Sequence, residues 1–468
     1  MNSAEHGRIM GRVSQPPHMP QPPARRRRWG VITLIALALI AVMGAGGWWA
    51  YGNRNPSEVS ANSTEEFVPP ATISTTEPVT TTNAAPPPQS WPTYGFDNAR
   101  TRWNPLLKHR PPFTKEWFFG SGGLLEFPPA VADGKLFVGQ LRGKFFAVDT
   151  ATGKVLWRKN IRHCSAASPA IADGIVYASF LARYPCPKGE AGEGGFVFAW
   201  NADTGEQLWA VALPPVESSP LVVNGTVYVG AWDKKVYALD ALTGATKWTT
   251  ETDAQIVSSA SWVDAASPGG RPALVIGTNG GTLYKLDADT GKILWQAQSL
   301  ERLGSGREYF YATPTVAYGR IYIGNTDGWM YAYGAETGKL LWAKAAGTYV
   351  YTAAVAADGV IYIGTYDGYV IAFDAATGAT NWKLSVPGAV HGAPTLMAGL
   401  LYFSTCSGCG RNGVRAAKSG PDGQYAIDIA TRKIVWTFPD GKYSPLVADD
   451  QRVYLTGVGV VHGMKPAN

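Results

Sequence analysis

The chain has 468 residues, of which 46% are hydrophobic and only 16% are charged. This length allows one large domain with additional segments, and few charges with 54 glycines and 17 tryptophans are typical of many short strands joined by tight turns. The net charge is +6, and residues 25–28 supply four of the positive charges. The rest of the chain has no basic stripe, so the composition excludes a nucleic-acid partner.

The N-terminal part predicts a single membrane span. Residues 30–51 contain no charged side chain and are long enough to cross a bilayer as a helix. The preceding arginines keep residues 1–29 in the cytoplasm as a disordered tail, and Trp48, Trp49 and Tyr51 suit the far interface. We therefore expect a signal-anchor in the cell membrane, with the remaining chain on the extracytoplasmic side. A cleaved signal peptide is the alternative, because small residues near the end of the segment permit cleavage.

Residues 52–90 are rich in proline, serine, threonine and alanine. They contain too few hydrophobic residues to build a core, so they predict a flexible to semi-extended linker.

From residue 91 onward one pattern recurs: a strand, an aspartate, two residues, Thr-Gly, three residues and a tryptophan. Its period of about 40–50 residues is typical of four-stranded propeller blades. Seven units are complete, and the eighth lacks its last strand at the C-terminus. We expect the strand around Trp117 to complete it, which pairs the two ends of the domain and removes an exposed sheet edge. The predicted fold is therefore an all-β, eight-bladed β-propeller over residues 91–468, with one tryptophan per blade: Trp117, Trp157, Trp209, Trp248, Trp295, Trp342, Trp382 and Trp436.

Residues that recur in every blade are predicted to be structural. The repeated aspartates are expected to cap the Thr-Gly turn with side-chain hydrogen bonds. Arg432 departs from the pattern because it stands where glycine is expected, and a left-handed backbone there costs roughly 1–2 kcal/mol.

This repeat resembles that of the pyrroloquinoline quinone (PQQ) family. The family contains quinoprotein alcohol dehydrogenases, which hold PQQ and Ca²⁺ on the propeller axis, and cofactor-free propellers such as the BamB-type scaffold of outer-membrane protein assembly. Residues 91–105 are similar to the N-terminal segment of the dehydrogenases. However, the chain lacks their vicinal cysteine pair and a Cys-x-x-Cys-His haem motif, and their calcium ligands match no local motif here. The repeat identifies the fold, whereas activity depends on the site.

Residues that break the repeat are the functional candidates. The connectors that enter each blade's first strand should line the central channel. At corresponding connector positions lie Glu126, Glu217, Tyr311, His391 and Lys442, with Arg307 just upstream of the tyrosine. Such a ring of polar residues could bind a polar ligand or a cation; a solvated channel mouth with scattered polar groups is the alternative.

Four cysteines lie in loops expected on this same face of the propeller. Disulfides are typical of extracytoplasmic domains, and we expect the pairs Cys164–Cys186 and Cys406–Cys409. A redox-active Cys-x-x-Cys motif and a zinc site are alternatives, but the first lacks its usual helix N-terminus and the second lacks nearby ligands.

The sequence contains no catalytic constellation and predicts no metal. It favours a non-catalytic binding or scaffold domain at the cell envelope, with a protein or glycan partner and no cofactor. The alternative is a PQQ- and Ca²⁺-dependent dehydrogenase of alcohols or sugars, in which case both cofactors are required. A sensor is a third interpretation, disfavoured because the N-terminal tail has no output domain.

Overall fold

The computed structural model describes residues 58–60, 63–70, 90–186, 194–265, 271–300, 309–409 and 417–467, within a compact unit that spans Pro56–Asn468. The predicted cytoplasmic tail and signal-anchor lie outside the described residues. Within the described ranges no helix is long and apolar enough to cross a membrane.

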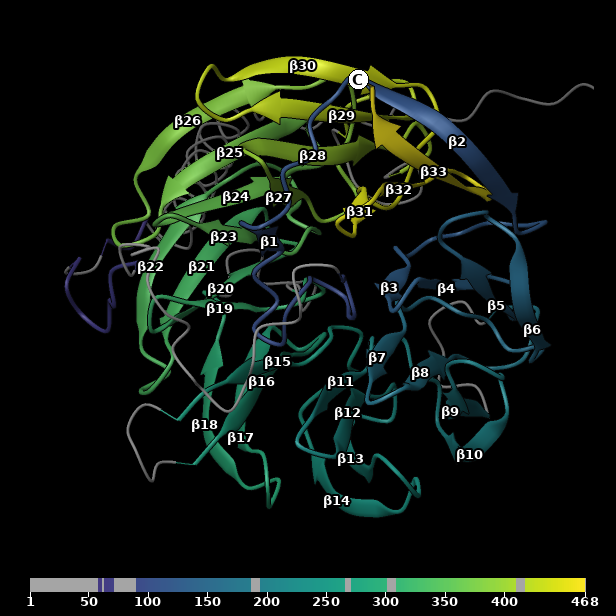
Figure 1. The fold of residues 1–468 in the computed structure, drawn as a ribbon. Coiled ribbons are helices and arrows are strands. Elements are labelled where there is room, and N and C mark those ends of the chain that lie inside the picture. The colour runs from purple at the N-terminus through teal and green to yellow at the C-terminus, as the bar shows by residue number, and fades with distance from the viewer. Residues whose placement is uncertain are drawn as a thin grey trace, which may run out of the picture. The chain divides into compact units, whose positions relative to one another are not determined.

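Eight antiparallel sheets of four strands follow one another along the chain and around a central axis, and one of them gains a fifth, parallel strand (Figure 1). We number them as blades 1 to 8, each with its first strand innermost. Blade 1 consists of β3 (Ala130–Ala132), β4 (Lys135–Gln140), β5 (Lys144–Asp149) and β6 (Val155–Asn160), and blade 2 of β7 (Ala170–Ala172), β8 (Ile175–Phe180), β9 (Gly195–Asn201) and β10 (Gln207–Leu213). Blade 3 consists of β11 (Leu221–Val223), β12 (Thr226–Gly230), β13 (Lys235–Asp240) and β14 (Thr246–Glu251), and blade 4 of β15 (Ser261–Val263), β16 (Ala273–Gly277), β17 (Thr282–Asp287) and β18 (Ile293–Gln298). Blade 5 consists of β19 (Thr315–Ala317), β20 (Arg320–Gly324), β21 (Trp329–Gly334) and β22 (Leu340–Ala345), and blade 6 of β23 (Val355–Ala357), β24 (Val360–Gly364), β25 (Tyr369–Asp374) and β26 (Thr380–Ser385). Blade 7 consists of β27 (Thr395–Met397), β28 (Leu400–Thr405), β29 (Gly423–Asp428) and β30 (Lys433–Phe438), and blade 8 of β31 (Val447–Ala448), β32 (Val453–Thr456), β33 (Val460–Pro466) and β2 (Phe113–Gly120).

The predicted closure is confirmed. β2 pairs antiparallel with β33, so the last sheet has the order β2-β33-β32-β31 and joins the two ends of the domain. Trp117 lies opposite Gly463 in this pairing, with the indole over a position that has no room for a side chain.

The repeated tryptophans join each blade to the next. The Trp157 indole donates a hydrogen bond to the carbonyl oxygen of Ala202 in blade 2. Gly205 in the same turn has φ +71°, and a Cβ added there would lie 2.7 Å from the Trp157 ring. Glycine therefore meets two requirements at once, a left-handed backbone and close approach to the indole. Equivalent contacts recur at Gly153, Gly244, Gly291, Gly338 and Gly378.

The repeated aspartates cap the turns as predicted. Asp149 Oδ1 accepts hydrogen bonds from the backbone N–H of Thr152 at 2.8 Å and from its hydroxyl at 2.6 Å. Arg432 keeps the left-handed backbone of the glycine it replaces, with φ +59°.

Residues 90–104 run across the inner strands and close the channel; we call them the plug. The backbone of the plug bonds in turn to blades 1, 2, 4, 5, 6 and 7, and ends in β1 (Trp103–Asn104), which pairs parallel with β27. The buried Arg100 guanidinium bonds to the carbonyl oxygens of Ala260 and Pro220, in blades 4 and 3. Burial, followed by repulsion from Arg102, lowers the pKa of Arg100 to about 9.

Residues 58–60 and 63–70, which we call the strap, differ from the linker expected for 52–90. Val59 and Ala343 of β22 exchange two backbone hydrogen bonds of 3.1 Å, so the strap adds to the outer edge of blade 5. Blade 5 has Gly334 where its neighbours carry the turn aspartate, and the Glu66 carboxylate occupies this space and accepts hydrogen bonds from Glu336 N and the Thr337 hydroxyl. The strap thus supplies, from a distant part of the same chain, the turn cap that blade 5 lacks.

Candidate functional site

A small cavity lies on the axis, between the plug and the connectors that enter the first strands. Its volume is about 50 Å³. The connectors emerge on the face that also carries the loops between second and third strands, which we call the connector face. The cavity is lined by Tyr94 of the plug and by residues of the connectors, among them Glu126, Phe127, Glu217, Tyr311, Tyr351, His391 and Tyr443.

Glu217 is the most perturbed acidic group in the cavity. Its Oε1 accepts a 2.6 Å hydrogen bond from the Tyr311 hydroxyl, and its Oε2 accepts a 3.1 Å bond from the Trp232 indole. The pKa of Glu217 is raised to about 7, mainly by burial and also by the charge of Glu126, although the two hydrogen bonds act to lower it. Burial likewise raises the pKa of Glu126. Two carboxyl groups that cannot easily both ionise therefore face one small space.

An aromatic stack continues the wall from Tyr311, next to Glu217. The Tyr311 and Tyr351 rings are stacked with centroids 4.1 Å apart, and Tyr351 stacks in turn on His391 at 4.8 Å. His391 Nδ1 lies 2.5 Å from the Tyr366 hydroxyl, and burial lowers the pKa of His391 to about 4. The imidazole is therefore neutral at pH 7 and belongs to the packed wall.

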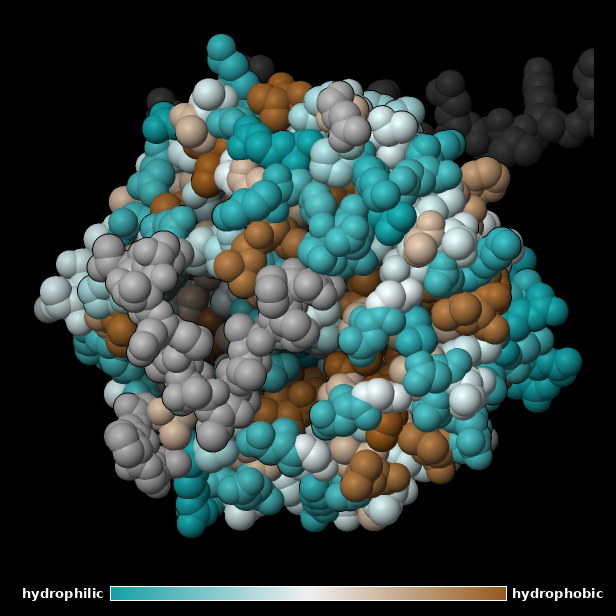
Figure 2. Space-filling model, in the orientation of Figure 1, coloured by the Kyte–Doolittle hydropathy of each residue, from teal (hydrophilic) through white to brown (hydrophobic). Residues whose placement is uncertain are grey.

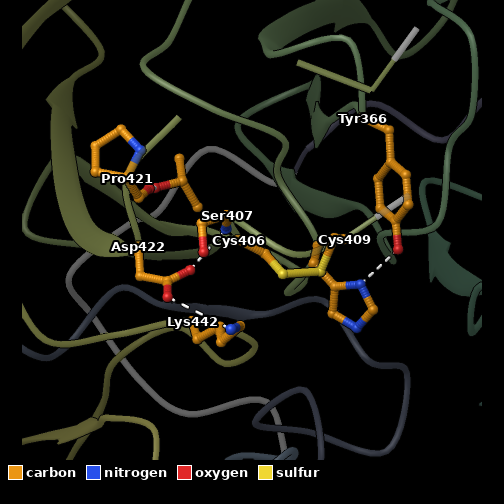
Figure 3. The surroundings of a disulfide bond; sticks show 9 residues. Tyr366, Cys406, Ser407, Cys409, Pro421, Asp422 and Lys442 are labelled. Carbon is orange, nitrogen blue, oxygen red and sulfur yellow. Dashed lines mark hydrogen bonds and ion pairs between the residues drawn. A yellow bond between two sulfur atoms is a disulfide. The ribbon is translucent and has the colours of Figure 1, made fainter. Parts of the chain in front are cut away.

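Four of the predicted ring residues meet at this cavity, and a fifth, Lys442, does not line it. Glu126, Glu217, Tyr311 and His391 line it. Lys442 turns aside and forms an ion pair with Asp422, with 3.4 Å between Nζ and Oδ2 (Figure 3). Arg307 lies outside the described residues.

The aromatic part of the wall was not predicted from the sequence. Tyr94, Phe127, Tyr351 and Tyr443 line the cavity but were not singled out. Two of them, Phe127 and Tyr443, follow a predicted ring position by one residue, so a wider window around each connector would have included them.

Both predicted disulfides are present, and both lie on the connector face. Cys164–Cys186 packs with Trp232, Val257 and Tyr311, so it supports the wall that holds Glu217. Cys406–Cys409 closes a four-residue turn in the loop after β28, where the Ser407 backbone N–H donates to Asp422 (Figure 3).

Comparison with known proteins identifies the family of this chain. A family model described as outer membrane protein assembly factor BamB matches residues 94–181, 190–297, 255–352 and 343–466. The chain belongs to this family. Its fold is also that of BamB from Moraxella catarrhalis, with a TM-score of 0.58 at 17% identity, over 75% of this chain and 99% of that one.

Two curated relatives represent the two kinds of protein that carry this repeat, the BamB-type scaffold and the alcohol dehydrogenase. BamB of Burkholderia pseudomallei (strain K96243) is 31% identical over 150 residues, which are 32% of this chain and 35% of that protein. Quinohemoprotein alcohol dehydrogenase of Comamonas testosteroni is 34% identical over 176 residues, which are 36% of this chain and 19% of that protein. The chain thus aligns with about a third or less of the length of these relatives, and family membership does not decide between binding and catalysis.

The axial cavity does not fit the cofactor of the dehydrogenases. Small-molecule sites usually measure about 300–1,000 Å³, whereas about 10–15 Å³ is enough to hold one water molecule. A cavity of about 50 Å³ bounded by Tyr94, Tyr311 and Tyr351 has no space for a tricyclic quinone. Among the described residues no three His, Cys, Asp or Glu side chains gather as they would around a metal ion.

Proposed function

We propose that this chain is a non-catalytic binding scaffold of the cell envelope, tethered by its N-terminal segment, whose connector face holds a protein partner. The size of the axial cavity carries this proposal. Its walls are stacked aromatic rings and two carboxyl groups, of which that of Glu217 is hydrogen-bonded, and the plug closes its other end. The place where a quinoprotein would hold its cofactor is thus filled by this chain's own side chains.

The connector face supplies the features that a binding surface needs. Two disulfides fix its loops, and Tyr184 beside Cys186 is 48% exposed. Figure 2 shows the face turned toward the viewer in Figure 1, where hydrophobic side chains reach the surface in separate patches among hydrophilic ones. Mixed surfaces with aromatic anchors are typical of non-obligate protein interfaces. A glycan partner would use the same exposed aromatic and polar groups.

The alternative, a PQQ- and Ca²⁺-dependent dehydrogenase, draws on one observation. Glu126 and Glu217 have raised pKa values at the axis, and perturbed carboxyl groups are frequent at catalytic sites. The dehydrogenase would require the aromatic wall to open before a cofactor could enter.

Equilibrium binding of PQQ to the purified full chain, with and without Ca²⁺, separates the two functions. The scaffold predicts no saturable binding at high micromolar PQQ. Saturable, Ca²⁺-dependent binding of one equivalent would overturn it and justify a substrate screen with a dye acceptor.

Photo-crosslinking in cells tests the scaffold directly. A photoreactive amino acid replaces Tyr184 on the connector face, or Leu242, which is 71% exposed in the Thr-Gly turn of blade 3 on the opposite face. We expect one discrete adduct with an envelope protein from position 184 and none from position 242. Equal adducts from both positions would contradict a partner specific to the connector face.

A further inference from the structure

The groove between blades 8 and 1 has the features that bind the strap on blade 5, but the strap does not fill it. This groove has a volume of about 890 Å³ and lies between the end of β2 and the outer strand β6. Its lining combines apolar side chains with basic ones: Phe119, Phe146, Val155, Leu156, Trp157, Lys144, Arg158 and Lys159. No aspartate or glutamate belongs to this lining. The groove therefore joins an apolar floor to a positive rim.

Blade 5 shows how such a groove binds an extended chain. Val59 of the strap bonds to the β22 edge at Ala343 and packs in the core cluster that contains Trp295 and Ala297 of blade 4. Two lysines hold the acidic residues of the strap. Lys344 Nζ lies 3.4 Å from Glu58 Oε2, and Lys339 Nζ lies 2.6 Å from Glu65 Oε1.

Blade 1 repeats this basic pair in register. The lysines of blade 5 stand three residues before and two residues after Trp342, and Lys154 and Lys159 stand at the same distances from Trp157. In the sequences of the other six blades at least one of these two positions is not lysine. Arg158 corresponds to Ala343, and both oppose the middle strand of their blade at the same register.

The edge of β6 is available for strand addition in the described part of the chain. β6 is the last strand of its sheet order, and its outer residues are exposed, with Val155 at 43% and Leu156 at 47%. An edge strand presents unpaired N–H and C=O groups that an extended peptide can pair with, while side-chain pockets select the peptide.

We propose that the groove between blades 8 and 1 binds an extended segment of a partner protein, in which acidic residues flank an apolar residue, by strand addition to β6. The apolar residue packs between Phe119 and Trp157, and the acidic residues pair with Lys154 and Lys159. The backbone of the segment pairs with Arg158. This inference deepens the proposed binding function and rests on it, and it assigns a second surface distinct from the connector face.

The test uses a fluorescent synthetic peptide with the sequence of residues 56–70, PSEVSANSTEEFVPP, and the full chain in mild detergent. The peptide's own site on blade 5 is occupied in cis, so added peptide reports on blade 1. We expect saturable binding that weakens about tenfold or more in Lys154→Glu/Lys159→Glu, which corresponds to about 1.4 kcal/mol. Binding should also weaken as salt concentration rises, because the pairs are at the surface.

Two further variants make the test specific. Arg158→Pro removes the outward N–H from an edge strand, where proline is tolerated, and should weaken binding without changing the circular dichroism spectrum. Lys292→Glu/Lys433→Glu makes the same change in net charge at the equivalent position of blades 4 and 7, and should leave binding unchanged.

Four results would overturn the proposal. They are the absence of saturable binding to the unmodified chain, equal binding by Lys154→Glu/Lys159→Glu, an equal loss in the blade 4 and 7 control, and a concentration-dependent dimer that this blade 1 variant abolishes. The last would assign the groove to the strap of a second copy instead of a partner protein. The crosslinks from position 184 do not depend on this groove, so failure here is distinguishable from failure of the scaffold function.

Discussion

Replacing the buried Glu217 by glutamine should stabilise the propeller at neutral and alkaline pH. In the native state its pKa is about 7, against 4.5 for an unperturbed glutamate, mainly because of burial. Between these two values the unfolded chain has lost its proton while the folded chain keeps it. Stability therefore falls as pH rises from about 4.5 to 7, and stays low above that. This rise in pKa corresponds to about 3 kcal/mol, at roughly 1.4 kcal/mol per pH unit.

Glutamine removes this cost because it carries no charge. Its amide oxygen can still accept the bond from Trp232, but its amide nitrogen cannot accept the bond from Tyr311, and a lost bond costs about 1 kcal/mol. We expect Glu217→Gln to raise the free energy of unfolding by about 2 kcal/mol at pH 8, and to leave it equal or slightly lower at pH 5.

Urea unfolding followed by tryptophan fluorescence at pH 5, 6, 7 and 8 measures this difference. Because a protein of this size can unfold in several steps, the comparison is made on the first transition of matched variants. Glu206→Gln, an exposed glutamate of blade 2, is the control and should change nothing at any pH. If Glu217→Gln were less stable than the unmodified chain at pH 8, or kept its pH dependence, then ionisation of the buried Glu217 carboxyl group would not be what lowers the stability at high pH.

Three further changes probe the framework around the site. Gly244→Ala should destabilise the propeller in thermal unfolding by about 1–3 kcal/mol more than Gly225→Ala does. Both glycines have a left-handed backbone, but a Cβ added at Gly244 would lie 2.8 Å from Trp209, whereas one added at Gly225 would meet nothing within 4 Å. Equal effects of the two substitutions would show that the indole contact is unimportant. Glu66→Ala should release the strap and speed its cleavage by an added protease about fivefold, or roughly 1 kcal/mol, while the propeller's melting temperature changes little; an unchanged cleavage rate would contradict the capping role. Cys164→Ser opens a disulfide that spans 22 residues and should lower stability by about 3 kcal/mol; the difference from the unmodified chain should vanish in reductant, and its persistence would point to packing instead of the cross-link.

The sequence predicted the blades because their signals are local. Strand alternation, the aspartate cap and the Thr-Gly turn each act within a few residues, and repetition made each one visible eight times or nearly so. Closure by the strand around Trp117 followed from counting, since an unpaired last blade would leave an open edge. The disulfide pairs followed from placing Cys164 and Cys186 on one face of the predicted disc.

The axial site was predicted only in part, because connectors have no periodicity that fixes side-chain direction. Four of the predicted ring residues line the cavity, whereas Lys442 turns toward Asp422, a partner on an irregular loop of blade 7. The stacking of Tyr351 on Tyr311 joins residues of two blades, and no local pattern encodes it.

The strap was missed for a different reason. Residues 58–70 lack the hydrophobic content of a core segment, so composition predicts a linker. The sequence signal for the strap lay in blade 5, in the turn that the strap contacts. Gly334 stands where blade 5 should have its aspartate, and the uncapped turn accepts Glu66. A missing structural residue in one repeat can thus indicate a partner elsewhere in the chain.

The same comparison between repeats separates two kinds of surface. Residues present in all blades cannot mark a single site, whereas features of one or two blades can. The lysine pair flanking the tryptophan occurs in blades 5 and 1, and the first of these already holds acidic residues of the strap. The disulfide loops occur in blades 2 and 7, on the connector face. Because separated sites with no shared contacts contribute independently, loss of the lysine pair of blade 1 should leave the crosslinks of the connector face unchanged. A scaffold that binds through an edge keeps its connector face free, and can therefore hold two partners at once.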